Sequence, residues 1–116
     1  MTVKRIVTNI ASPNVGEAAR FYGDVLGIRI VMDHGWIQTF AAEGTATPQI
    51  SIASEGGAGT EVPDLSVEVD NLDQVLERAR SGGFEILYGP AIEPWGVRRF
   101  FVRDPFGRVV NILQHQ

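Results

Sequence analysis

Apolar and polar residues alternate along several short stretches of this chain, and two other stretches show helical spacing. Residues 5–11 alternate in polarity, which predicts a strand. Asn14 then offers an N-cap for an amphipathic helix, whose apolar positions are Val15, Ala18, Ala19, Tyr22, Val25 and Leu26. Gly27 suits a left-handed C-cap, and further strands are expected at residues 28–32, 36–41 and 49–54.

The second half of the chain repeats this order of elements. Apolar residues alternate with polar ones over residues 65–69, and helical spacing follows at Leu72, Val75, Leu76 and Ala79. Three more strands are expected at residues 84–88, 98–102 and 109–113, with Asp104-Pro105-Phe106-Gly107 as a β-turn. Such a repeat predicts one domain over residues 1–116, built from module one (about 1–55) and module two (about 61–116) around a glycine-rich linker.

The composition narrows the class of protein. The 116 residues are 44% hydrophobic and 21% charged, which is typical of one globular domain. No apolar run is long enough to cross a bilayer and no signal-peptide core is visible, so we expect a cytoplasmic protein without membrane contact. The net charge of -4 argues against nucleic-acid binding, and Arg98, Arg99 and Arg103 are expected on a solvated face or paired with local carboxylates. The absence of cysteine excludes disulfides, thiolate metal sites and a cysteine nucleophile.

Two motifs add a family resemblance. The run from Ala18 to Gly27, AARFYGDVLG, resembles the helix-one signature of the vicinal oxygen chelate superfamily, which covers glyoxalase I, bleomycin resistance proteins and extradiol dioxygenases. The Trp95-Gly96 pair before the Asp104–Arg108 hairpin looks most like the bleomycin resistance branch. The resemblance implies an α+β fold in which two tandem β-α-β-β-β modules form a curled mixed sheet around a cavity, commonly in a homodimer.

The positions that hold a metal in the enzymes of that superfamily are poor in ligands here. By the resemblance they fall on Val7, Asp64, Asn111 and either Gln49 or Ser51. Valine has no donor atom, and an amide oxygen is a weak ligand without charge. His34 in a turn and His115 near the C-terminus are expected on the surface. We therefore expect no metal, no other cofactor and no catalytic residue.

Strand alternation groups the candidate ligand-binding residues. Asn9 and Ser66 share the face of Val7, Asp64 and Asn111, as do Glu68, Val109 and Leu113. Aromatic rings on one parity of the 36–41 strand and in the loop before residue 98 could stack on a flat ligand. Phe100 and Phe101 point to opposite faces, which leaves open which one meets the cavity. The candidates are Val7, Asn9, Trp36, Gln38, Phe40, Asp64, Ser66, Trp95, Phe101 and Asn111.

These features favour a homodimeric, metal-free protein that sequesters an aromatic natural product or antibiotic, because resistance by sequestration needs affinity and no chemistry. One alternative is a lyase, isomerase or dioxygenase with a divergent metal site that includes Asp64, or a proton transfer with Asp64 or Glu68 as the base. A second alternative is a regulatory subunit whose aromatic cleft accepts a partner protein or a cofactor such as a flavin.

Overall fold

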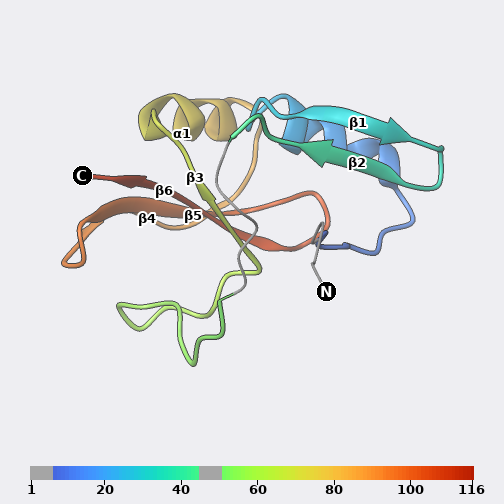
Figure 1. The fold of residues 1–116 in the computed structure, drawn as a ribbon. Helices are drawn as coiled ribbons and strands as arrows, with labels where there is room; N and C mark the ends of the chain where they lie inside the picture. Colours follow the sequence, from blue (N-terminus) through green and yellow to red (C-terminus); the bar gives the residue numbers. More distant parts are fainter. Residues whose placement is uncertain (1–6, 45–50) are drawn as a thin grey trace.

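The computed structural model describes residues 7–44 and 51–116 and has a mixed α+β architecture (Figure 1). Helical segments and strands occur in both halves of the chain. In order they are η1 (Val15–Glu17), η2 (Ala19–Gly23), β1 (Arg29–Asp33), β2 (Gln38–Ala41), β3 (Leu65–Glu68), α1 (Leu72–Ser81), β4 (Ile86–Glu93), β5 (Val97–Arg103) and β6 (Val109–His115). In the parts of the chain so described, no helix is long and apolar enough to span a membrane.

The second half forms a four-stranded mixed sheet in the order β3-β6-β5-β4. β3 pairs with β6 in parallel, whereas the β6–β5 and β5–β4 pairs are antiparallel. The predicted turn between β5 and β6 is confirmed: the Asp104 N–H donates to the carbonyl of Arg108, and Gly107 has the positive φ that a glycine adopts without strain. The strands predicted in this half are confirmed, with β4, β5 and β6 longer than expected.

Helix α1 covers one face of this sheet (Figure 1). Its predicted apolar positions, Leu72, Val75, Leu76 and Ala79, are all buried. Asn71 caps the helix, since its side-chain oxygen accepts a hydrogen bond from the N–H of Gln74 at 3.2 Å. The buried face packs on Phe100, Val102, Val110 and Ile112 of β5 and β6. The core therefore lies between α1 and the sheet, and it also takes in side chains of η2.

The helix predicted in the first half has a different hydrogen-bond pattern from the one expected. A 3-10 turn, η1, leads into the π-helix η2, in which the Asp24 N–H donates to the carbonyl of Ala19, five residues back. Gly16 and Gly23 lower the helical propensity of this stretch, which makes departures from α-helical spacing less costly. The buried residues Phe21 and Val25 still reach the core. Gly27 has the predicted left-handed conformation, with a φ of 72°, but η2 ends at Gly23 and its C-cap is Asp24.

The two outer strands predicted for the first half are not observed in the described part of those segments. Residues 7–11 and 51–54 contain no strand, and the remainder of both predictions, Arg5, Ile6, Gln49 and Ile50, lies outside the described residues. β1 and β2 instead form a separate antiparallel hairpin beside the helical segment (Figure 1). A strand needs a partner for its backbone groups, and residues 7–11 face β2 across a cavity instead of pairing with it.

Candidate binding pocket

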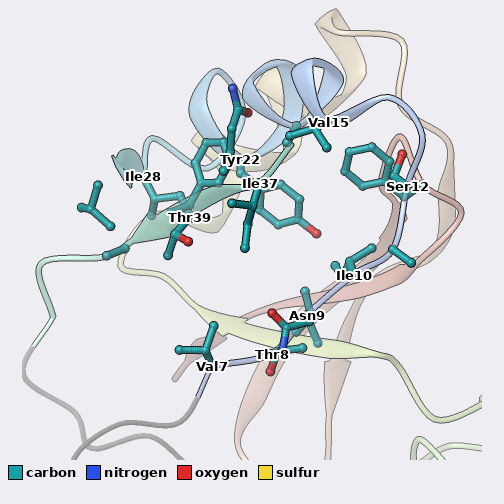
Figure 2. A pocket seen from close by; sticks show the side chains of 18 of the residues that line it. Val7, Thr8, Asn9, Ile10, Ser12, Val15, Tyr22, Ile28, Ile37 and Thr39 are labelled. Carbon is teal, nitrogen blue, oxygen red and sulfur yellow. The ribbon is translucent and has the colours of Figure 1, made fainter. Parts of the chain in front are cut away.

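A cavity of about 950 Å³ lies between the segment of residues 7–12, the helical residues around η2 and the β1–β2 hairpin (Figure 2). Leu65 from β3 and Phe106 from the β5–β6 turn complete its wall, so both halves of the sequence contribute to it. In Figure 2, Ile37 and Thr39 extend from the hairpin toward the segment that carries Thr8 and Asn9. A cavity of this size is within the usual range for small-molecule sites.

The described part of the pocket lining is uncharged. Apolar side chains such as Val15, Ile28 and Ile37 form most of the wall. Hydroxyl and carboxamide groups are supplied by Thr8, Asn9, Ser12, Gln38 and Thr39. The lining contains no Asp, Glu, Lys, Arg or His among the described residues. Such a surface can bury a flat apolar body while it offers a few hydrogen bonds that orient the ligand.

Tyr22 is an aromatic wall residue that also ties the pocket to the rest of the fold. Its ring lies 5.8 Å from that of Phe40, and its O–H donates to a carboxylate oxygen of Asp104 at 2.7 Å. Burial, followed by this hydrogen bond, raises the pKa of the Tyr22 phenol far above its ordinary value. The phenol therefore stays neutral and serves as a fixed donor, not as a base. Asp104 also accepts the backbone N–H groups of Phe106 and Arg108, which holds the turn beside the pocket.

Half of the residues proposed from the sequence line this pocket. Val7, Asn9, Trp36, Gln38 and Phe40 do so. Trp36 is 76% exposed to solvent, so it lies on the solvent-facing side of the lining. The sequence analysis did not select the other lining residues, among them Tyr22, Ile37 and Thr39. The spacing of Tyr22 marked it as part of the helix, and Ile37 and Thr39 have the strand parity opposite to the one chosen, so periodicity alone could not find them.

The other proposed residues lie away from the pocket. Oδ2 of Asp64 accepts the N–H of Val109 at 2.8 Å and so joins the beginnings of β3 and β6. The side-chain amide of Asn111 donates to the hydroxyl of Ser66 at 3.2 Å across the same pair of strands. Among the described residues, no group of three or more His, Cys, Asp and Glu side chains is placed to hold a metal ion. His115 is exposed at the sheet edge, with Nδ1 2.9 Å from a carboxylate oxygen of Glu68.

Trp95 and Phe101 belong to a cluster around Arg99 on the face of the sheet opposite α1. The guanidinium carbon of Arg99 lies 4.8 Å from the ring centre of Phe101, 5.0 Å from that of Trp95 and 5.4 Å from that of Tyr88. Phe100 points into the α1 core, which resolves the orientation of the two adjacent phenylalanines. Arg99 is only 4% exposed. Of the two expectations for this arginine, pairing with a local carboxylate is the one observed, since its Nε lies 3.5 Å from a carboxylate oxygen of Glu93, and aromatic rings keep it from a solvated face.

The glycine-rich linker is held onto this cluster. Nη1 and Nη2 of Arg99 donate to the carbonyls of Gly56 and Gly57 at 2.7 and 3.2 Å. A β-carbon added to Gly57 would lie 2.8 Å from the Trp95 ring, so this approach needs glycine. The same stretch closes on itself through the N–H of Gly56 and the carbonyl of Thr60, 2.8 Å apart. The linker predicted from the sequence is therefore a tight turn that hydrogen bonds hold against the sheet.

The comparisons with known proteins agree with this architecture. A family model described as the Glyoxalase/Bleomycin resistance protein/Dioxygenase superfamily matches residues 4–112. No sequence among the curated proteins matches the chain. Several solved structures have the same fold over nearly the whole chain.

One of these is TnmS3, an antibiotic binding protein from Streptomyces sp. CB03234, with 23% identity, a TM-score of 0.70, and coverage of 100% of this chain and 99% of that chain. TioX from Micromonospora sp. ML1 is 22% identical, with a TM-score of 0.65 and 97% of both chains covered. Lactoylglutathione lyase from Agrobacterium tumefaciens is 18% identical, with a TM-score of 0.65 and coverage of 98% and 96%. At these identities the likeness concerns the fold, which here serves both binding and catalysis.

Proposed function

Since this chain belongs to the Glyoxalase/Bleomycin resistance protein/Dioxygenase superfamily, we propose that it binds and sequesters a planar aromatic small molecule, such as a natural-product antibiotic, without a metal. The observation that carries the proposal is the cavity of about 950 Å³ beside β2, whose described lining residues are uncharged. A protein that confers resistance by sequestration needs only affinity, and a largely apolar cavity supplies it by removing much of the ligand surface from water.

Aromatic side chains support this choice of ligand. Tyr22, Trp36 and Phe40 all line the cavity and come from η2 and the β1–β2 hairpin. Ring stacking on such side chains adds roughly 0.5–1.5 kcal/mol per pair beyond the burial of area. The antibiotic binding protein TnmS3 has the same fold along its whole length, which is consistent with this use of the architecture.

The described residues at the metal positions implied by the family resemblance do not supply a converging ligand set. Val7 has no donor atom, and Asp64 already accepts a backbone N–H of β6. Asn111 directs its amide nitrogen to Ser66, and Gln49 lies outside the described residues. A divalent transition metal favours imidazole, thiolate and carboxylate ligands that converge on one point. The proposal therefore assigns no metal to the site and derives no reaction through one.

A second copy of the chain is part of the proposal. Ile30, Val31 and Met32 of β1 are 40%, 52% and 38% exposed, and Val31 also lines the pocket. An isolated two-stranded hairpin with three adjacent exposed apolar side chains is marginal in water and favours a covering partner. We expect a homodimer in which the partner covers β1. A Val31→Glu substitution should shift the mass measured by light scattering toward the monomer.

The two tryptophans provide a matched pair of probes for ligand binding. Trp36 lines the pocket, whereas Trp95 packs on Arg99 outside it. Fluorescence of the Trp95→Phe variant should be quenched saturably by one member of a panel of aromatic antibiotics, at about one ligand per subunit. The Trp36→Phe variant should show little quenching, because its remaining tryptophan does not line the pocket.

Metal analysis of the same purified protein completes the test. The proposal expects substoichiometric metal together with saturable quenching. About one tightly held divalent metal per subunit, with no quenching by any compound, would reject sequestration in favour of the metalloenzyme alternative. Equal quenching of both variants would move the binding site away from the described pocket.

A further inference from the structure

The chemistry of the pocket lining narrows the class of ligand beyond its aromatic character. No lining residue in the described segments carries a formal charge. The carboxylate of Asp104 stands behind Tyr22, but it already accepts the Tyr22 hydroxyl and two backbone N–H groups at 2.7–2.8 Å. Asp33 likewise accepts the N–H of Gly35 and the amide of Gln38. These two carboxylates are therefore engaged in hydrogen bonds within the protein.

The polar groups of the lining are gathered on two facing segments. Thr39 extends from β2 toward the segment that carries Thr8 and Asn9 (Figure 2). Thr8 and Asn9 are exposed and Thr39 is half-buried, so a bound molecule can reach their hydroxyl and carboxamide groups. Elsewhere the wall is largely apolar, with Val15, Ile37 and Phe40 as examples. The described lining therefore carries polar groups on these two facing segments and is largely apolar elsewhere.

We propose that the ligand is electrically neutral and carries hydroxyl or carbonyl groups on a flat apolar ring system, with Thr8 and Asn9 binding these groups from one side of the cavity and Thr39 from the other. This inference rests on the proposed binding function and specifies its ligand. A charged ligand would lose hydration against a wall whose described residues offer no opposite charge, which is unfavourable unless the charge is paired. A neutral hydroxyl or carbonyl needs only one or two hydrogen bonds, and these three residues can supply them.

Four anthracenes with the same ring system and different substituents test this directly. They are 9-methylanthracene, 9-anthracenemethanol, 9-anthracenecarboxylate and 9-(aminomethyl)anthracene, and binding to the full chain is measured by quenching of Trp36 in the Trp95→Phe variant. We expect the alcohol to bind tightest. The carboxylate and the ammonium compound should bind at least about 100-fold more weakly at pH 7, as expected for an unpaired charge removed from water. Equal or tighter binding of either charged compound would overturn the inference.

A substitution of equal size tests whether the hydroxyl of Thr39 binds the ligand. Thr39→Val removes one hydroxyl while it keeps the side-chain shape, and it should weaken binding of the alcohol about 2- to 10-fold without changing that of 9-methylanthracene. Ser66→Ala is the matched control, since Ser66 lies on the sheet away from the pocket and its loss should leave both affinities unchanged. Equal losses for both compounds would show a general disturbance of the pocket and would reject the assigned hydrogen-bonding role.

A reversal of charge separates this inference from the proposed function. Asn9→Asp places a carboxylate on the polar segment of residues 8–12 and should improve binding of the ammonium compound while weakening that of the carboxylate compound. If all four anthracenes bind the parent protein with similar affinity, the neutral-ligand inference fails and the binding function stands. If none of the four binds, and no compound of the antibiotic panel does either, the proposed function itself fails.

Discussion

Replacing Arg99 by methionine removes a charge that is enclosed inside the protein. The guanidinium lies among three aromatic rings, donates to the carbonyls of Gly56 and Gly57, and has Nε 3.5 Å from a carboxylate oxygen of Glu93. That last contact is electrostatic, because Nε has no hydrogen-bond partner among the described residues. Methionine keeps an apolar chain of similar reach against the rings and removes only the charge and its donors.

The expected loss is large because both charged partners are buried. The side chains of Arg99 and Glu93 are only 4% and 3% exposed, so Glu93 would keep an unpaired charge in the variant. Breaking a buried ion pair by removing one partner typically costs about 3–5 kcal/mol, and the attraction to the aromatic rings is already part of that loss. The whole domain is expected to be stable by only about 5–15 kcal/mol. Arg99→Met should therefore remove about a fifth or more of the free energy of unfolding.

Urea unfolding followed by far-ultraviolet circular dichroism measures this loss. With a slope of about 2 kcal/mol per molar for a domain of this size, the midpoint should fall by about 2 M. Arg98→Met is the matched control, because the neighbouring arginine pairs with Asp73 at the surface of α1, where ion pairs contribute little. Its midpoint should change several times less. Limited proteolysis should also cut within residues 55–60 faster in Arg99→Met than in the control.

The double variant Arg99→Met with Glu93→Gln identifies the cause. Removing the stranded carboxylate should recover part of the lost stability, since a neutral amide is less costly to bury than an unpaired charge. If Arg99→Met unfolds at the same urea concentration as Arg98→Met, the arginine is not an important internal clamp. If the loss is large and Glu93→Gln recovers none of it, the ion pair is not its source.

Two further predictions concern hydrogen bonds at pH extremes. Tyr22→Phe should lower the free energy of unfolding at pH 7 by about 1.5–3 kcal/mol, measured by urea unfolding, because Asp104 loses its hydroxyl donor. Because the pKa of Tyr22 is raised in the folded state, the contribution of its hydroxyl to the free energy of unfolding is complete below pH 10.0 and is lost as the pH rises above that value. A difference in stability between Tyr22→Phe and the parent protein that stays unchanged at higher pH would contradict this. Asp73→Asn should lower stability at pH 7, and the deficit should vanish as the pH falls below 3.8, because Arg98 lowers the pKa of Asp73 in the folded state; a deficit that persists in acid would refute this assignment.

The sequence by itself was sufficient where local patterns determine structure. Asn71 and the apolar spacing that follows it specify α1, because a cap and a helical stripe are encoded within about ten residues. The turn from Asp104 to Gly107 is equally local, since its own side chain and its glycine close it. Two motifs also identified the superfamily correctly.

Only the tertiary structure decided which surfaces meet. Alternation showed that Phe100 and Phe101 face opposite sides, but α1 packing against one face determined which is core. The burial of Arg99 was not predicted, because it depends on rings and carbonyls that lie elsewhere in the chain. The pocket likewise brings residues 7–12 together with β2 and Phe106. Because residues 7–12 do not form a strand, consecutive residues of this segment line the pocket instead of alternate ones. Periodicity encodes the faces of an element, whereas the partner of each face depends on contacts between distant residues, which no local pattern contains.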